Sequence, residues 1–173
     1  MDRFKCLVDS PPGMKRFKAK YHIPQGVSLR YCAPDQVLTH KNEGEVVIPI
    51  IVFIEGGMTF PMSRVTRDYL IAHRLCPYQC TLNLFKVLGN VDALNKQMSL
   101  RLTWHDVVYM YKCHLLVDLG YYLNSRSSIV RLVLCLPKSN KGMKDNYVIA
   151  SREWHDCLQC PTREGEVGGV PQG

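Results

Sequence analysis

The stretch of sequence that decides the fold is GYYLNSRSSIVRLVLCLPKSNKGMKDNYVIASREW, residues 120–154. It contains two apolar runs rich in β-favouring residues, residues 129–136 and residues 147–150. Runs of this length and composition are typical of strands, and the polar loop between them predicts a hairpin. Residues 121–123 predict a further short strand just before it.

The connecting loop, residues 137–146, carries three lysines, Lys138, Lys141 and Lys144, together with a glycine and two asparagines. Lysine side chains and backbone N–H groups in such a loop can hold a phosphate. The commoner explanation is an ordinary hairpin connection whose charges keep it solvated. The sequence alone leaves both interpretations open.

Three helices are predicted upstream of this stretch. Ser63 is placed to cap a helix over residues 64–73. Apolar residues at spacings of three and four predict a second helix over residues 78–98. A capping-box pattern that begins at Thr103 predicts a third helix, which we expect to end at Gly120.

The 173 residues, 46% hydrophobic and 21% charged, suit a single folded domain. Residues 46–54 (VVIPIIVFI) are short, apolar and β-branched, as in a buried strand. Pro49 cannot donate a ladder hydrogen bond, which favours an edge strand, a bulge or an extended segment lying on the helices. Together these elements predict an α+β domain over residues 45–156, in which three to four helices pack with a small antiparallel sheet.

Both ends of the chain are predicted to lie outside this domain. Residues 1–44 are expected to form a basic, largely irregular arm, because Pro11, Pro12 and Gly13 interrupt a helix. Residues 157–173 are rich in glycine, proline and glutamate, which predicts a disordered tail.

Positive charge is concentrated in the predicted arm. The formal net charge of the chain is +7, and residues 1–41 carry eight basic and three acidic side chains. The candidate contact residues are Lys15, Arg16, Lys18 and Lys20. An arm of this sign favours weak, sequence-independent binding of nucleic acid through counterion release. The alternative is a solvated leader that keeps the chain soluble.

The cysteines raise the question of metal binding. Without a secretory signal or a run of about 20 apolar residues, we expect an intracellular protein, nuclear or cytoplasmic, that makes no membrane contact and keeps its eight cysteines reduced. Cys157 and Cys160 form a CxxC pair, which is half of a zinc site or a redox pair. Further zinc ligands would have to come from His155, His73, Cys76 or Cys80. Since one pair is a weak signal, we expect no cofactor and keep zinc as the alternative.

Acidic residues are few and scattered. A nuclease-type site needs several carboxylates that converge on metal ions, and the available residues are Asp68, Asp92, Asp106 and Asp118. All four fall on or beside predicted helices, where a capping role or a solvated face is the commoner explanation. The sequence also lacks a phosphate-binding loop and a dinucleotide fingerprint. We therefore expect a protein without catalytic residues.

Several short motifs occur in a recognisable order. They are Gly57, Phe60-Pro61 and Leu70; Leu75, Pro77, Gln79 and Asn83; Gly120-Tyr121-Tyr122-Leu123 and Arg126; and Ser139, Lys141, Gly142, Lys144 and Tyr147. On these residues the chain resembles, from about Gly57 to Ile149, the plant gypsy-type transposon domain family, also described as transposase-like or gag-like. It departs from the family at Met143, where the family usually has tryptophan. The resemblance implies a longer parent protein and no catalytic residues to carry over.

The leading expectation is a non-enzymatic domain derived from a transposable element. It would act in assembly or protein interaction, by self-association or with partners, and would bind nucleic acid weakly. One alternative is a small zinc-binding or thiol-dependent protein centred on Cys157 and Cys160. The other is a degenerate fragment that has no independent function.

Overall fold

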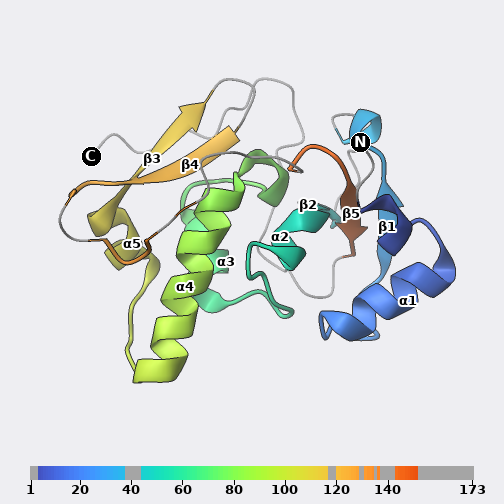
Figure 1. Cartoon of the computed structure of the whole chain (residues 1–173), viewed down its shortest axis with the longest axis horizontal. Coiled ribbons are helices and arrows are strands. Elements are labelled where there is room, and N and C mark those ends of the chain that lie inside the picture. Colours follow the sequence, from blue (N-terminus) through green and yellow to red (C-terminus); the bar gives the residue numbers. More distant parts are fainter. Residues whose placement is uncertain are drawn as a thin grey trace.

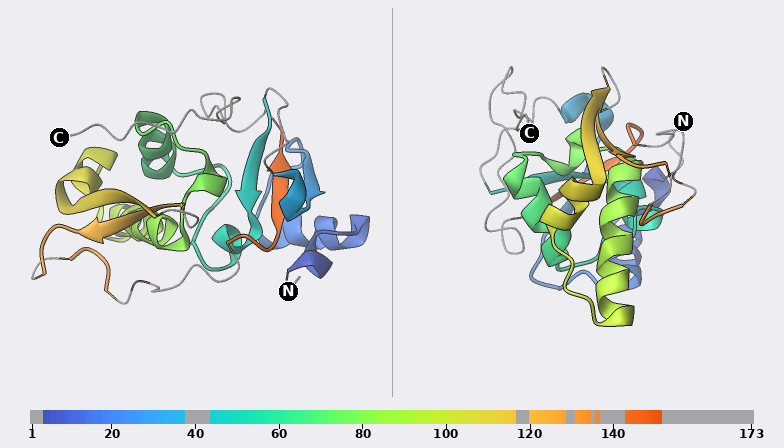
Figure 2. Two further views of the ribbon diagram at one scale, coloured as in Figure 1. Left: turned by 90° about the horizontal axis from the view of Figure 1, so that it is seen from above. Right: turned by 90° about the vertical axis from the view of Figure 1, so that its left-hand side faces the viewer.

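The computed structural model describes residues 4–37, 44–116, 120–128, 131–134, 136 and 143–151. Within these residues the chain is an α+β protein in which helices pack with two small antiparallel sheets (Figure 1). The predicted fold class is therefore confirmed. The two sheets lie toward opposite ends of the molecule, with helices α2, α3 and α4 between them (Figure 2).

The three-stranded sheet is built around the last strand of the described chain. Its order is β1 (Leu29–Cys32), β5 (Tyr147–Ala150) and β2 (Val46–Pro49), and β5 runs antiparallel to both neighbours. All four residues of β5 are buried. The strand predicted over residues 147–150 is confirmed, but its predicted hairpin partner is wrong. The described residues 131–134 form no strand, because β1 and β2 occupy both edges of β5.

Pro49 marks the point where an edge strand turns into a helix. Strand β2 lies at the sheet edge, where the missing N–H of proline costs no ladder bond. The chain then forms α2 (Ile50–Ile54), whose first N–H, that of Ile50, donates to the Asn146 carbonyl at 3.0 Å. The segment predicted as one strand is thus a strand followed by a buried helical turn.

The N-terminal segment is part of the fold, so the prediction of a largely irregular arm is wrong for its described part. After η1 (Lys5–Leu7), helix α1 (Pro11–Lys20) begins where the two prolines were expected to prevent a helix. Ser10 caps it by accepting from the Gly13 N–H at 3.3 Å. Prolines fit a first helical turn, because those N–H groups have no helical partner. A further turn, η2 (Pro34–Gln36), follows β1.

Helix α1 is anchored by Phe17. This side chain is 3% exposed and packs edge-on against Phe53 of α2, with ring centroids 5.6 Å apart. It also contacts the ring of Tyr21, at a centroid distance of 4.7 Å. The aromatic contact joins the N-terminal segment to the same hydrophobic core that contains the helices.

The two predicted central helices are confirmed with small changes at their ends. Helix α3 (Arg64–Ala72) begins after Ser63, whose hydroxyl accepts from the Thr66 N–H at 3.3 Å. The second helix is shorter than predicted, because Pro77 starts a separate turn, η3 (Pro77–Gln79). Helix α4 (Leu82–Met98) follows and continues through Gly89 without a break.

The third predicted helix is wrong over its second half. Helix α5 (Trp104–Met110) starts with the expected capping box, and the Thr103 N–H donates to Asp106 Oδ2 at 2.7 Å. The chain then forms β3 (Tyr111–Leu116), which pairs with β4 (Gly120–Ser125). Strand pairing has overridden helix propensity here, as tertiary contacts commonly do.

Gly120 opens a strand instead of closing a helix. Its φ is +101°, and a Cβ at this position would lie 2.4 Å from the Gln79 carbonyl oxygen. Only glycine avoids both the strained backbone and this clash. The contact places β4 against the start of α4, where the Thr81 N–H donates to the Tyr121 carbonyl at 2.8 Å.

We predict that Phe17→Ala lowers the free energy of unfolding by about 3–5 kcal/mol, the usual cost of removing a buried aromatic side chain. Chemical denaturation followed by circular dichroism measures this. Lys20→Ala, an exposed change on the same helix, is the control and should change stability by less than about 0.5 kcal/mol. Equal stability of both variants and wild type would show that α1 is not anchored in the core.

Candidate functional site

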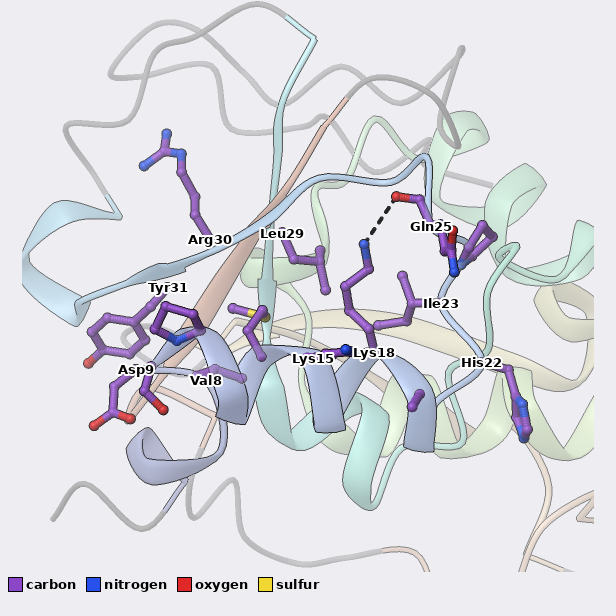
Figure 3. Close-up of a pocket in the computed structure, with 15 residues that line it drawn as sticks. Val8, Asp9, Lys15, Lys18, His22, Ile23, Gln25, Leu29, Arg30 and Tyr31 are labelled. Atoms are coloured by element: carbon purple, nitrogen blue, oxygen red, sulfur yellow. Dashed lines mark hydrogen bonds between the residues drawn. The ribbon is translucent and has the colours of Figure 1, made fainter.

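A groove lies between helix α1, the turn that follows it and strand β1 (Figure 3). Its volume is about 1040 Å³. The side chains that form its floor are apolar: Met14 of α1, Ile23 of the following turn, Leu29 of β1, and Val8 of the connection that precedes α1. Val8 and Ile23 are buried in the core, so the floor is fixed by the packing of the domain.

Two basic residues at the groove already have partners in the structure. Lys18 Nζ donates to the carbonyls of Gln25 at 3.2 Å and Val27 at 2.7 Å, so it holds the turn against α1 (Figure 3). Arg30 forms an ion pair with Glu45 at 2.8 Å. These two side chains therefore shape the groove, and their charges are partly satisfied within the domain.

Lys15, Arg16 and Lys20 present their charges to solvent. All three are exposed on α1, which contains no acidic residue. Lys15 lies at the groove, and Lys20 Nζ lies 5.5 Å from the centroid of the Tyr21 ring. Within the described part of the chain, no hydrogen bond or ion pair involves Lys15 or Arg16. These residues are available to an anionic ligand.

The surrounding segment has the same sign of charge. Residues 4–31 contain six basic side chains and a single acid, Asp9, which gives a net charge of +5. Because α1 is packed on the core through Phe17, these charges occupy fixed positions at one end of the molecule (Figure 1). The sequence correctly identified the basic residues but placed them on an irregular arm.

Only part of the predicted lysine loop can be placed. Lys144 is described and exposed, whereas Lys138 and Lys141 lie outside the described residues. Met143, which stands where the resembling family has tryptophan, is buried in the hydrophobic core. Phosphate binding by this loop stays a prediction.

The predicted zinc site cannot be placed, because its central residues are outside the described part of the chain. Cys157, Cys160 and His155 lie outside the part of the chain that the structure describes. Cys76 is disulfide-bonded, so the expectation of eight reduced thiols is wrong at this position. Cys80 is a buried thiol whose pKa is raised by burial. Among the described residues, no three His, Cys, Asp or Glu side chains gather where they could hold a metal ion.

Three of the four candidate carboxylates have structural roles. Asp68 pairs with Arg64 and Arg67 on α3, and Asp92 pairs with Lys96 on α4 at 2.9 Å. The pKa of Asp106 is lowered by the hydrogen bonds it accepts from the Thr103 N–H and hydroxyl. Asp118 lies outside the described residues. Asp68, Asp92 and Asp106 thus lie on separate helices and are each engaged there.

The groove itself was missed by sequence reasoning. Its floor residues are far less distinctive than the lysines, and they meet only because α1 packs beside β1. One local signal was present: Ser10 directly precedes Pro11 and Pro12, which is a pattern of helix starts. A helix predicted from this start would have placed Lys15 and Lys18 on one helical face, because they are three residues apart.

A buried histidine gives the fold a pH-sensitive point away from the groove. His73 ends α3, and its Nδ1 lies 3.0 Å from the Tyr69 carbonyl oxygen. Its ring stacks on Tyr69, at a centroid distance of 4.1 Å, and meets Trp104 edge-on. Burial lowers the pKa of His73 and outweighs the contact with the Tyr69 carbonyl, which raises it.

We predict that His73→Gln makes the stability of the protein less dependent on pH. The unfolded chain protonates His73 near its ordinary pKa of about 6.5, whereas the folded protein does so only at lower pH. The stabilisation from neutral His73 is therefore complete above about pH 6.5 and is lost as the pH falls through the lowered pKa. Urea midpoints measured between pH 7 and pH 5 should fall more steeply for wild type than for His73→Gln.

The exposed His105→Gln is the matched control for this measurement. A wild type whose midpoint falls no faster than that of His73→Gln would contradict the prediction.

Comparison of the chain with models of protein families, with curated proteins and with solved structures gives no match. Among the described residues, no helix has both the length and the apolar character needed to cross a membrane. The site is therefore interpreted from its own residues: an exposed basic helix face beside a groove with an apolar floor.

Proposed function

We propose that this chain is a non-enzymatic binding domain, derived from a transposable element, that binds nucleic acid through the exposed basic face of α1. The observation that carries the proposal is the fixed display of Lys15, Arg16 and Lys20 on a helix without acidic residues. The family resemblance of residues 57–149 supports the origin of the domain. The described carboxylates, which are engaged on separate helices, support a role without catalysis.

The spacing of the three charges suits a phosphate backbone. Arg16 and Lys20 are four residues apart, so they lie on the same side of the helix and about 6 Å apart along its axis, while Lys15 projects about 100° around the helix from Arg16. Phosphates advance about 3.4 Å per nucleotide along one strand of a duplex, so the helix face covers a few phosphates. Since α1 is already ordered by Phe17 and Ser10, the protein loses little conformational freedom when these side chains bind.

The surrounding charge supports the same partner. With a net charge of +5 over residues 4–31, this end of the molecule attracts polyanions before contact is made. Such binding depends on counterion release and carries no sequence information. The domain would therefore bind many nucleic-acid sequences with similar affinity, and weakly at physiological salt.

We predict that Lys15→Glu/Arg16→Glu/Lys20→Glu weakens nucleic-acid binding and flattens its salt dependence. Fluorescence anisotropy with a labelled single-stranded oligonucleotide, between about 50 and 200 mM salt, measures both. Each lost phosphate contact on a single strand lowers the slope of log K against log salt by ~0.7, so the slope should fall by about 2.

The matched control is Arg64→Glu/Lys96→Glu/Arg101→Glu, which makes the same change in net charge on and after α3 and α4. It should retain most of the wild-type slope. Circular dichroism would show that both variants are folded. Equal losses in the two variants would mean that net charge matters and the α1 face does not.

A second candidate function, assembly with other protein chains, is favoured by the apolar floor of the groove. Met14 and Leu29 are only partly buried, and an accessible groove with an apolar lining commonly marks a binding site. Ala19 is exposed and lines the groove, so a larger side chain there would fill it without removing a charge.

We predict that Ala19→Trp weakens self-association of the chain. Sedimentation equilibrium across a range of protein concentrations should show a lower association constant than for wild type. Gln97→Trp, an exposed change on α4, is the control and should associate like wild type. Identical association constants for wild type and Ala19→Trp would remove the groove from assembly.

A further inference from the structure

The β3–β4 hairpin has two different faces. Side chains alternate along a strand, and the register pairs Cys113 with Leu123 and Leu115 with Tyr121 on one face. Tyr121 and Leu123 are buried in the core, so this face packs inward. The other face carries the alternate residues and points away from the core.

The outward face combines aromatic, amide and basic groups. His114 pairs with Tyr122 across the strands, and their rings stack with centroids 5.4 Å apart and planes 27° apart. Lys112 and Asn124 form the next pair on the same face, and both are exposed. On the other side of the aromatic pair, Leu116 lies opposite Gly120 and is 39% exposed, so the rings have polar neighbours on one side and an apolar neighbour on the other.

Arg126 extends the basic edge of this face. It follows β4 directly, its backbone N–H donates to the Met110 carbonyl at 2.9 Å, and its Nε donates to the Val108 carbonyl at 3.1 Å. These bonds fix an exposed guanidinium at the end of the hairpin where Lys112 and Asn124 lie. Seen from this end of the molecule, β3 lies in front (Figure 2).

We propose that this face binds single-stranded nucleic acid by stacking an unpaired base on the His114–Tyr122 pair. The inference rests on the proposed nucleic-acid function and adds the class of ligand. A base that continues the stack would lie against the free face of one of the two rings, beside the Lys112–Asn124 pair. Aromatic stacking of this kind is the usual way in which proteins hold unpaired bases.

The neighbouring side chains complete the chemistry. The Lys112 ammonium and the Arg126 guanidinium donate hydrogen bonds to the phosphates on either side of the stacked base. The Asn124 amide can both donate to and accept from the edge of the base. A duplex keeps its bases paired and stacked on one another, so its ring faces cannot reach the aromatic pair.

The hairpin face is separate from the basic face of α1. The two lie at opposite ends of the long axis of the molecule (Figures 1 and 2). Duplex and single strand should therefore share the contact with α1, whereas only the single strand uses His114 and Tyr122. This difference allows each contact to be tested without the other.

The test compares wild type with Tyr122→Leu, on one single-stranded oligonucleotide and on its duplex. Tyr122→Leu should lower the affinity for the single strand about tenfold, the usual cost of losing one stacked base, and leave duplex affinity unchanged. A 2-aminopurine base in the oligonucleotide should be quenched on binding wild type and should stay bright with Tyr122→Leu. Tyr122→Phe, which keeps the ring, should behave like wild type.

Asn124→Asp provides a second variant in case Tyr122→Leu fails to fold. It changes an exposed side chain and places a negative charge beside the proposed phosphate contacts, so it should also weaken single-strand binding selectively. Unchanged single-strand affinity in a folded Tyr122→Leu or Asn124→Asp would overturn the inference. If the α1 triple variant still lost affinity for both ligands in that case, the proposed nucleic-acid function of α1 would stand without the hairpin site.

The reverse result is equally distinct. A selective loss in Tyr122→Leu, together with no effect of the α1 triple variant, would support the hairpin site and reject α1 as the contact. Absence of binding to either oligonucleotide by wild type at low salt would overturn both proposals.

Discussion

The position of strand β5 is the constraint on which the rest of the structure depends. Strands β1 and β2 are not neighbours in the sheet, and each pairs with β5, which follows about a hundred residues later in the chain. Both ends of β5 are tied in place, because Asn146 accepts from Ile50 and the Ser151 N–H donates to Ser28 at 2.9 Å. Because β1 forms one wall of the groove beside α1, the pairing of β1 with β5 helps to hold that wall in place.

Local signals predicted much of the fold, and long-range pairing decided the remainder. Ser63 and Thr103 marked helix starts correctly, because a cap depends only on residues within one turn. The C-terminal end of α5 could not be predicted from local residues in this way. Residues after Met110 keep a helix-compatible pattern, and they become a strand because residues 120–125 are available to pair. The hairpin predicted between residues 129–136 and β5 was wrong because long-range pairing prevailed. Strand β5 pairs with β1 and β2, which lie far upstream in the chain.

The sequence was enough to identify the basic residues of the candidate site, but not to predict how they are arranged on the surface. Lys15, Arg16 and Lys20 stand out in the sequence because basic residues are dense there. The role of Lys18 in holding the turn at Gln25 depends on backbone carbonyls that no sequence pattern reveals. The outward hairpin face could not be predicted, because Lys112 and His114 were assigned to a helix, where they would not pair with Tyr122 and Asn124 of the next strand.

The uneven distribution of charge along the molecule has a consequence for how it would sit on a polyanion. Residues 1–41 hold a net charge of +5, and the remaining 132 residues hold +2. The molecule is therefore an electric dipole whose positive end contains α1. On a negatively charged polymer it would dock with that end first and leave the β3–β4 hairpin facing outward. If both proposed faces bind nucleic acid, a chain docked in this orientation would be able to capture a second strand and so cross-link two separate polymers.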